Sequence, residues 1–156
     1  MKKHYTNSGF SLIELMIAVA IVGILTAIAY PSYTSFIIDA RRTDGQEALM
    51  GFANAMERFK TENMTYVGAG TAGAGNVTTG APAATTFPTQ APLDGNDKFY
   101  NLTIVSAASL TYTLRATPID GTSQADDGLM EITSTGVRRW DQNNDDDTAD
   151  AGETSW

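Results

Sequence analysis

The sequence predicts an α+β protein in which one long N-terminal helix packs on a four-stranded antiparallel sheet. Three patterns support this prediction: an apolar run of 21 residues from Phe10 to Tyr30, an amphipathic stripe after it, and alternating strand patterns within residues 99–140. At 156 residues the chain is long enough for one domain beyond this helix. We therefore expect an N-terminal helix followed by a small globular domain.

The first half of the predicted helix, residues 10–30, is apolar enough to cross a membrane. Only Ser11, Glu14 and Thr26 interrupt it with polar groups. A hydrocarbon core about 30 Å thick requires roughly 20 apolar residues in a helix. Because a carboxylate in such a span is costly and usually functional, Glu14 is expected to have a specific partner.

Cleavage of the chain after Gly9 would create a partner for Glu14. Phe10 would then carry a free α-amino group four residues before Glu14, and residues four apart share one face of a helix. A carboxylate in the first turn also complements the positive end of the helix dipole. The Phe10 ammonium and the Glu14 carboxylate could pair within one subunit or between neighbouring subunits.

Residues 31–63 are predicted to continue the helix as an amphipathic half that ends near Asn63. Pro31 removes one backbone hydrogen bond, so a kink is expected there. This kink is either a local irregularity without consequence or a hinge used when subunits leave the bilayer. Apolar residues recur at spacings of three and four along one face: Leu49, Phe52, Met56 and Phe59. We expect this stripe to pack under the sheet.

Residues 64–98 are predicted to form a surface loop. They are rich in Gly, Ala, Thr and Pro and show no apolar periodicity. Long connections of this kind in compact domains are usually functional or mobile.

Residues 99–140 are predicted to form the antiparallel sheet. Strand patterns cover residues 99–106, 110–117, 129–134 and 137–140, and short turns join them as two hairpins. In the second strand the apolar residues alternate with polar ones: Leu110, Tyr112, Leu114 and Ala116. This alternation is typical of a strand with one buried face.

Residues 141–156 form an acidic C-terminal segment. Three of them match the first three oxygen-ligand positions of an EF-hand calcium loop: Asp141, Asn143 and Asp145. Asp146 stands in the place of the required glycine and Gly152 in that of the bidentate glutamate, so the full motif fails. Two interpretations stay open: a loop that binds Ca²⁺, and a solvated acidic loop whose charges repel one another. No cofactor is otherwise expected.

The composition argues against an enzyme and against direct nucleic-acid binding. The chain has no cysteine, and its only histidine, His4, precedes Gly9. The chain after Gly9 therefore lacks the residues for a Ser-His-Asp triad or a histidine-ligated zinc site. Without Lys2 and Lys3, 8 basic residues remain against 18 acidic ones. Such an excess of negative charge opposes binding to phosphates.

The N-terminal segment resembles the processing signal of type IV pilins. The similar residues are Ser8-Gly9-Phe10-Ser11-Leu12-Ile13-Glu14-Leu15-Met16 and Tyr30-Pro31-Ser32-Tyr33. The resemblance implies that residues 1–9 are a leader that a prepilin peptidase removes after Gly9. It also implies that Phe10 becomes the N-methylated terminus and that Glu14 guides subunits into a filament.

The globular part resembles the minor pilins of the type IVa class, most closely the PilE-like group. The similar segments are Tyr112-Thr113-Leu114, Ala116-Thr117-Pro118 and Ser134-Thr135-Gly136-Val137, followed by Trp140. In these pilins a disulfide closes the C-terminal segment. Here Asp127 and Ser155 stand where cysteine is usual, which suggests that another contact replaces the disulfide.

The resemblance implies a structural subunit of a type IV pilus, a minor one, with a role in twitching motility, adhesion or DNA uptake. Its prepilin would cross the bacterial inner membrane once, and the mature chain would enter an extracellular filament. Its implied partners are other pilin subunits and the inner-membrane assembly machinery. Two alternatives remain: a pseudopilin of a type II secretion system, and a secreted binding module released by signal-peptide cleavage after Ala29.

Overall fold

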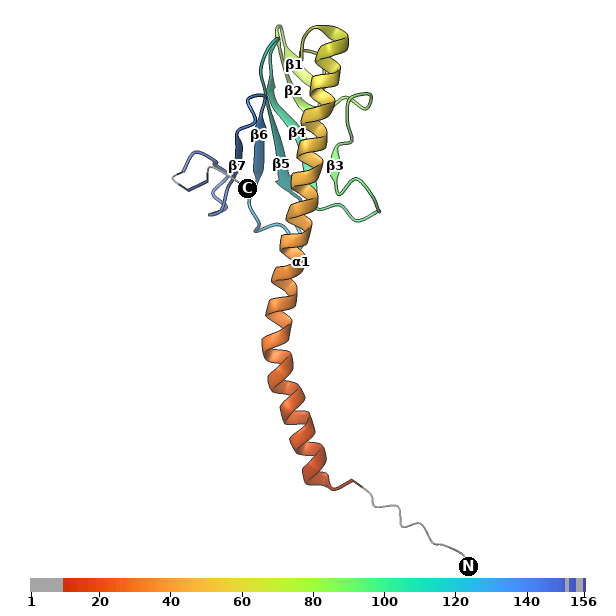
Figure 1. Cartoon of the computed structure of the whole chain (residues 1–156), viewed down its shortest axis with the longest axis vertical. Helices are drawn as coiled ribbons and strands as arrows, with labels where there is room; N and C mark the ends of the chain where they lie inside the picture. The colour runs from red at the N-terminus through yellow and green to blue at the C-terminus, as the bar shows by residue number, and fades with distance from the viewer. Residues whose placement is uncertain (1–9, 151, 154–155) are drawn as a thin grey trace, which may run out of the picture. The chain divides into compact units, whose positions relative to one another are not determined.

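The structure is a computed structural model that describes residues 10–150, 152–153 and 156 (Figure 1). The chain divides into two compact units, Met1–Ile37 and Ile38–Trp156. The single helix α1, Leu12–Asn63, contributes residues to both units.

Helix α1 ends at Asn63, the residue where the sequence pattern predicts its end. Met64 follows with a positive φ of 60°, and its amide donates to the carbonyl of Lys60 at 2.7 Å. A residue in the left-handed region commonly terminates a helix in this way. The helix continues through Pro31, and the kink expected at that residue stays a prediction.

The second unit contains a seven-stranded antiparallel sheet, not the four-stranded sheet that the sequence patterns predict. Its strands are β1 Gly70–Ala74, β2 Val77–Pro82, β3 Gln90–Ala91, β4 Tyr100–Ala107, β5 Tyr112–Pro118, β6 Met130–Thr133 and β7 Arg138–Trp140. The order across the sheet is β1-β2-β4-β5-β6-β7, and β3 also pairs with β4. The α+β class is confirmed, and the strand count is corrected.

The three additional strands lie in residues 64–98, so the prediction of a surface loop there is wrong. Strand β1 forms the edge of the sheet, and its residues are exposed except for half-buried Gly70. An edge strand without a buried face needs no apolar alternation, so its pattern was absent from the sequence. The detectable signal was Gly75-Asn76, which forms the two-residue turn between Ala74 and Val77.

The four predicted strands are confirmed as β4, β5, β6 and β7, with bounds that differ by at most two residues. Tyr112, Leu114 and Ala116 on β5 are buried as expected. Leu110 is an exception, because it lies before β5 and is 71% exposed.

The core lies between the second half of α1 and one face of the sheet, which lie against each other in Figure 1. Leu49, Phe52 and Met56 are fully buried, and Phe59 packs against the same cluster, as the helical stripe predicts. A Cβ at Gly45 would come within 2.8 Å of the Met130 side chain. Glycine at this position therefore lets the helix backbone approach the sheet closely.

Candidate assembly site on the N-terminal helix

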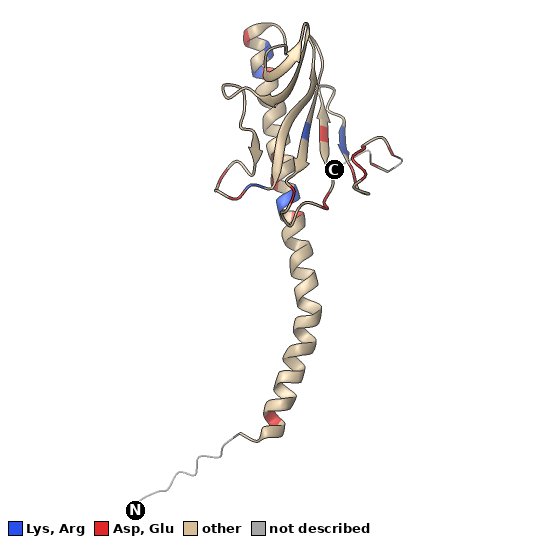
Figure 2. Cartoon of the chain, turned by 180° about the vertical axis from the view of Figure 1, so that it is seen from behind, with Lys and Arg blue, Asp and Glu red and all other residues tan. Residues whose placement is uncertain are grey.

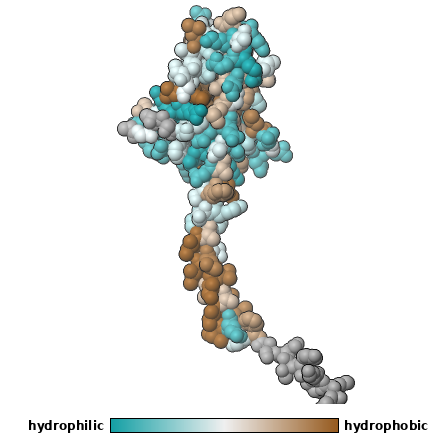
Figure 3. Space-filling model, in the orientation of Figure 1, coloured by the Kyte–Doolittle hydropathy of each residue, from teal (hydrophilic) through white to brown (hydrophobic). Residues whose placement is uncertain are grey.

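The first unit exposes apolar side chains around the whole circumference of the helix. The exposed large apolar residues between Leu12 and Phe36 each have at least 53% of their surface accessible to solvent. Figure 3 shows these residues as a brown stretch along α1. The described residues contain one helix that is long and apolar enough to cross a membrane. So large an apolar surface requires lipid or other apolar helices around it.

Glu14 has a partner within its own helix. Its Oε2 accepts the backbone N–H of Ser11 at 2.8 Å. This contact is one half of a capping box, in which the third helical residue satisfies the amide of the N-cap residue. This capping role is not among those predicted above for Glu14, although Ser11-Leu12-Ile13-Glu14 carries the S-x-x-E pattern itself.

The processing residues are described only in part. Gly9 lies outside the described residues, so the predicted cleavage after it stays a prediction. Phe10 lies just before the helix and is 82% exposed. The Phe10 amine expected to pair with Glu14 exists only after cleavage. Of its two carboxylate oxygens, Glu14 uses only Oε2 in the hydrogen bonds of the described residues.

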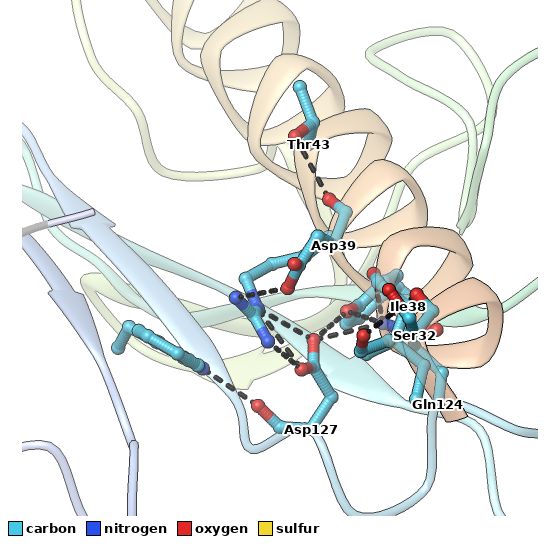
Figure 4. A network of polar contacts seen from close by, with 10 residues as sticks. Ser32, Ile38, Asp39, Thr43, Gln124 and Asp127 are labelled. Carbon is cyan, nitrogen blue, oxygen red and sulfur yellow. Dashed lines mark hydrogen bonds and ion pairs between the residues drawn. The ribbon is translucent and has the colours of Figure 1, made fainter. Parts of the chain in front are cut away.

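Asp127, at one of the positions where the resembling pilins carry cysteine, anchors the β5–β6 connection to α1 (Figure 4). The Arg42 Nε lies 3.0 Å from both Asp127 carboxylate oxygens, and Arg42 Nη2 also pairs with Oδ1. The indole N–H of Trp140 donates to the Asp127 carbonyl at 2.7 Å. Asp127 thus connects α1, the β5–β6 connection and β7 through an ion pair and hydrogen bonds. Ser155 lies outside the described residues.

Two further buried groups complete the Asp127 cluster. The Tyr100 hydroxyl donates to Asp127 Oδ2 at 2.6 Å. Gln124 Nε2 donates to the same oxygen at 2.9 Å and to the carbonyl of Ile38 at 2.9 Å. Burial and the bond to the Asp127 carboxylate raise the pKa of Tyr100 well above its ordinary value. Burial is the largest single influence and lowers the pKa of Arg42, but the hydrogen bond and negative charge of Asp127, together with the charge of Asp39, outweigh it, so the net shift of the pKa is upward. Tyr100 therefore stays neutral and Arg42 stays charged at neutral pH.

The structure brings Asp141, Asn143 and Asp145 together in one turn after β7. Asp141 is fully buried, and its Oδ1 accepts the amide of Asp145 at 3.2 Å. The Asn143 Nδ2 donates to Asp145 Oδ2 at 3.1 Å. Within the described residues, no three acidic or histidine side chains meet at the spacing of a metal site.

Most basic residues of the second unit, which are blue in Figure 2, contact other residues of that unit. Arg41 and Arg138 lie over the rings of Phe99 and Trp156. Arg115 pairs with Glu131 at 2.8 Å. Lys98 donates to two backbone carbonyls, and Lys60 lies over the Tyr66 ring. The described contacts leave two cations without a partner: Arg58 and Arg139.

Two family models match adjoining parts of the chain. The prokaryotic N-terminal methylation motif matches residues 5–30. The model described as "Type IV minor pilin ComP, DNA uptake sequence receptor" matches residues 31–130, most of the globular unit. The chain belongs to this family of type IV minor pilins. The N-terminal motif and most of the globular unit of this pilin are therefore each matched by a family model.

Three curated relatives are similar to parts of the chain. The fimbrial protein EcpC of Eikenella corrodens is 30% identical over 71% of this pilin and 62% of its own length. The type IV major pilin protein PilA of Myxococcus xanthus is 42% identical over 38% of this pilin and 27% of its own length. The type II secretion system core protein G of Pseudomonas aeruginosa is 37% identical over 38% of this pilin and 42% of its own length. The chain thus spans less than two thirds of each of these relatives.

The fold is similar to that of a solved minor pilin. The crystal structure of the Neisseria meningitidis non-core minor pilin PilV matches with a TM-score of 0.52 at 16% identity, over 70% of this pilin and 92% of that chain. At this identity the match supports the fold alone.

Proposed function

We propose that this pilin is a structural, non-enzymatic minor subunit of a type IV pilus, assembled through its N-terminal helix. The observation that carries the proposal is the apolar, exposed first half of α1 in a chain whose globular unit matches the minor pilin family. A prepilin peptidase would cut after Gly9 and methylate Phe10. The prepilin would cross the bacterial inner membrane once, and the assembly machinery would transfer the mature chain to an extracellular filament.

The apolar surface of the helix alone does not favour the filament over the membrane. Lipid tails are as apolar as leucine, so exchanging lipid for neighbouring pilin helices brings no hydrophobic gain. A charged group within the apolar region is different, because its cost falls when it meets an opposite charge. The carboxylate of Glu14 and the ammonium that cleavage exposes on Phe10 supply such a pair. Their attraction would draw an incoming subunit into register with the filament.

The capping contact of Glu14 allows its charge to be separated from its hydrogen bond. Glutamine at position 14 can still accept the Ser11 N–H as a capping-box residue, but it carries no charge. We expect Glu14→Gln to leave membrane insertion and leader cleavage intact and to reduce incorporation into filaments strongly. Immunoblots of membranes measure insertion and leader cleavage, and immunoblots of sheared filaments from the same strain measure incorporation.

The control for this experiment is Glu62→Gln, which removes an exposed carboxylate near the other end of the same helix. This variant should enter filaments at the level of the unchanged chain. Normal incorporation of the Glu14→Gln chain would contradict the electrostatic role and leave Glu14 only a helix cap. Retention of both variants in the membrane would point to a general defect.

The family description names a receptor for the DNA uptake sequence, so DNA uptake is the cellular role that it favours. We propose that this subunit contributes to uptake as part of the filament and makes few phosphate contacts of its own. The engaged basic residues support this view, since only Arg58 and Arg139 lack a partner among the described contacts. A type II secretion pseudopilin is the remaining alternative, and the presence of the chain in isolated pili distinguishes the two.

A further inference from the structure

The C-terminal segment folds around the side chain of Asp141. The Asp141 amide donates to the carbonyl of Leu129 at 2.9 Å, which fixes the start of the loop to the sheet. The carboxylate accepts the amides of Asp145 at 3.2 Å and Asp146 at 3.0 Å. The loop therefore curls back over its first residue, and the exposed Asn143 accepts the amide of Asp145 at 3.2 Å within this turn.

The turn survives the loss of the glycine that an EF-hand loop requires. Asp146, in the glycine position, adopts a positive φ of 69°, and Asn144 adopts 57°. Aspartate and asparagine tolerate this region better than other non-glycine residues. The mismatch at position 146 consequently does not prevent the sharp bend of a calcium loop.

Glu153 provides a second, independent observation that points to a cation ligand. It is only 4% exposed, and its Oε1 accepts the amide of Gln142 at 3.1 Å, which holds the carboxylate against the start of the loop. Its Oε2 is buried and has no hydrogen-bond partner among the described residues. A buried carboxylate oxygen without a partner is costly and calls for a ligand or an ion.

Asp141 and Glu153 also lack a compensating positive charge. The ion pairs of the described residues involve Asp39, Asp127 and Glu131 and neither of these two carboxylates. Two buried carboxylates at one end of a loop are unfavourable unless a cation neutralises them.

We propose that this loop binds one Ca²⁺ ion through Asp141, Asn143, Asp145 and the free Oε2 of Glu153. Carboxylate and amide oxygens are hard ligands, and Ca²⁺ accepts six to eight of them in flexible loops. Zinc is disfavoured because the loop contains neither histidine nor cysteine. Backbone carbonyls and water would complete the coordination. The ion would fasten the C-terminal segment that a disulfide closes in the resembling pilins.

Binding requires the side chains to move toward one another. No three acidic side chains of the described residues stand at metal-ligand spacing, so Asp145 and Glu153 must close on Asp141 when the ion enters. The two tryptophans of the chain flank the loop at positions 140 and 156. Their fluorescence should therefore report the closure.

The test uses the purified full-length pilin in detergent micelles. Thermal unfolding is followed by tryptophan fluorescence in excess calcium, in excess magnesium and in chelator. At a calcium concentration about a hundred times the Kd the midpoint should rise by several degrees. Magnesium should have a smaller effect. Terbium luminescence sensitised by Trp140 then gives the affinity, and added calcium should displace the terbium.

Two variants assign the ion to the loop. Asp145→Asn removes the negative charge of an exposed side chain. Glu153→Gln removes the negative charge of the carboxylate whose Oε2 has no partner among the described residues. Each should weaken calcium binding at least tenfold, whereas Asp97→Asn, an exposed carboxylate outside the loop, should leave it unchanged. An identical midpoint in calcium and in chelator would overturn the proposal, and so would unchanged affinity in both loop variants.

Discussion

Arg42 on α1 and Asp127 in the β5–β6 connection form an ion pair in which the aspartate side chain is only 4% exposed and the arginine 19%. Asp127 also accepts hydrogen bonds from Tyr100 and Gln124. Arg42 and Asp127 are 85 positions apart in the sequence, so this ion pair connects α1 to the segment between β5 and β6.

Removal of Asp127 should be strongly destabilising. Asp127→Ala would leave the Arg42 guanidinium largely buried without its main counter-charge, which costs about 3–5 kcal/mol in buried pairs. Asp39 offers a matched control, because it contacts the same arginine but is 65% exposed. Asp39→Ala should cost about 1 kcal/mol or less. Urea unfolding followed by tryptophan fluorescence measures both, and equal losses would contradict the role assigned to Asp127.

Gly128 should be intolerant of any side chain. It has a φ of 75°, and a Cβ there would lie 1.7 Å from the carbonyl oxygen of Asp141. Gly121 has the same φ of 75° with open space around it. Gly121→Ala should therefore cost only the backbone strain, about 1–2 kcal/mol. Gly128→Ala should cost several times more or prevent folding. Similar melting temperatures for the two variants would show that the contact with Asp141 is unimportant.

The globular unit should lose stability at alkaline pH. Burial and a 2.8 Å hydrogen bond to Glu57 raise the pKa of Tyr66 to about 12, whereas an unfolded tyrosine titrates near 10. Because the folded state favours the neutral phenol, this stabilisation is complete below about pH 10 and declines as the pH rises toward 12. Tyr100 and Tyr112 are shifted in the same direction.

Tyr66→Phe isolates this contribution. The variant should be less stable at neutral pH, because it lacks the bond to Glu57, and should lose less stability between about pH 10 and 12. Urea midpoints across this pH range give the comparison. An identical pH slope for both chains would rule out Tyr66 as a source of the alkaline loss.

DNA binding by the isolated pilin should be weak and only modestly dependent on salt. Only Arg58 and Arg139 lack a partner among the described contacts. Because each phosphate contact adds about −0.9 to the slope of log affinity against log salt concentration, this slope should be no steeper than about −2. Fluorescence anisotropy with duplex DNA at several salt concentrations measures the slope. A value near −6 would reveal a phosphate-binding surface that the described contacts do not predict.

Sequence patterns predicted the elements whose residues have one buried face. The stripe Leu49, Phe52 and Met56 and the alternation of β5 both arise from burial against the same core, so their periods were visible. Strand β1 lies at the sheet edge and is almost fully exposed, which left only its turn residues as a signal. Residues 64–98 were therefore misassigned as a loop.

The polar contacts were less predictable than the apolar ones. The capping bond of Glu14 has a local pattern, because the S-x-x-E spacing of Ser11 and Glu14 is visible in the sequence. The pairing of Arg42 with Asp127 has no local pattern, because it depends on how the β5–β6 connection returns to the helix. The unpartnered oxygen of Glu153 likewise becomes apparent only when burial is known.

Mass spectrometry of filaments sheared from the producing cells tests the proposed pilus function most directly. The account predicts that this chain is present at low abundance and that its N-terminal peptide begins at Phe10 with a methylated amine. A chain absent from the filaments, or a mature terminus at Tyr30, would contradict assembly through the Phe10–Glu14 pair.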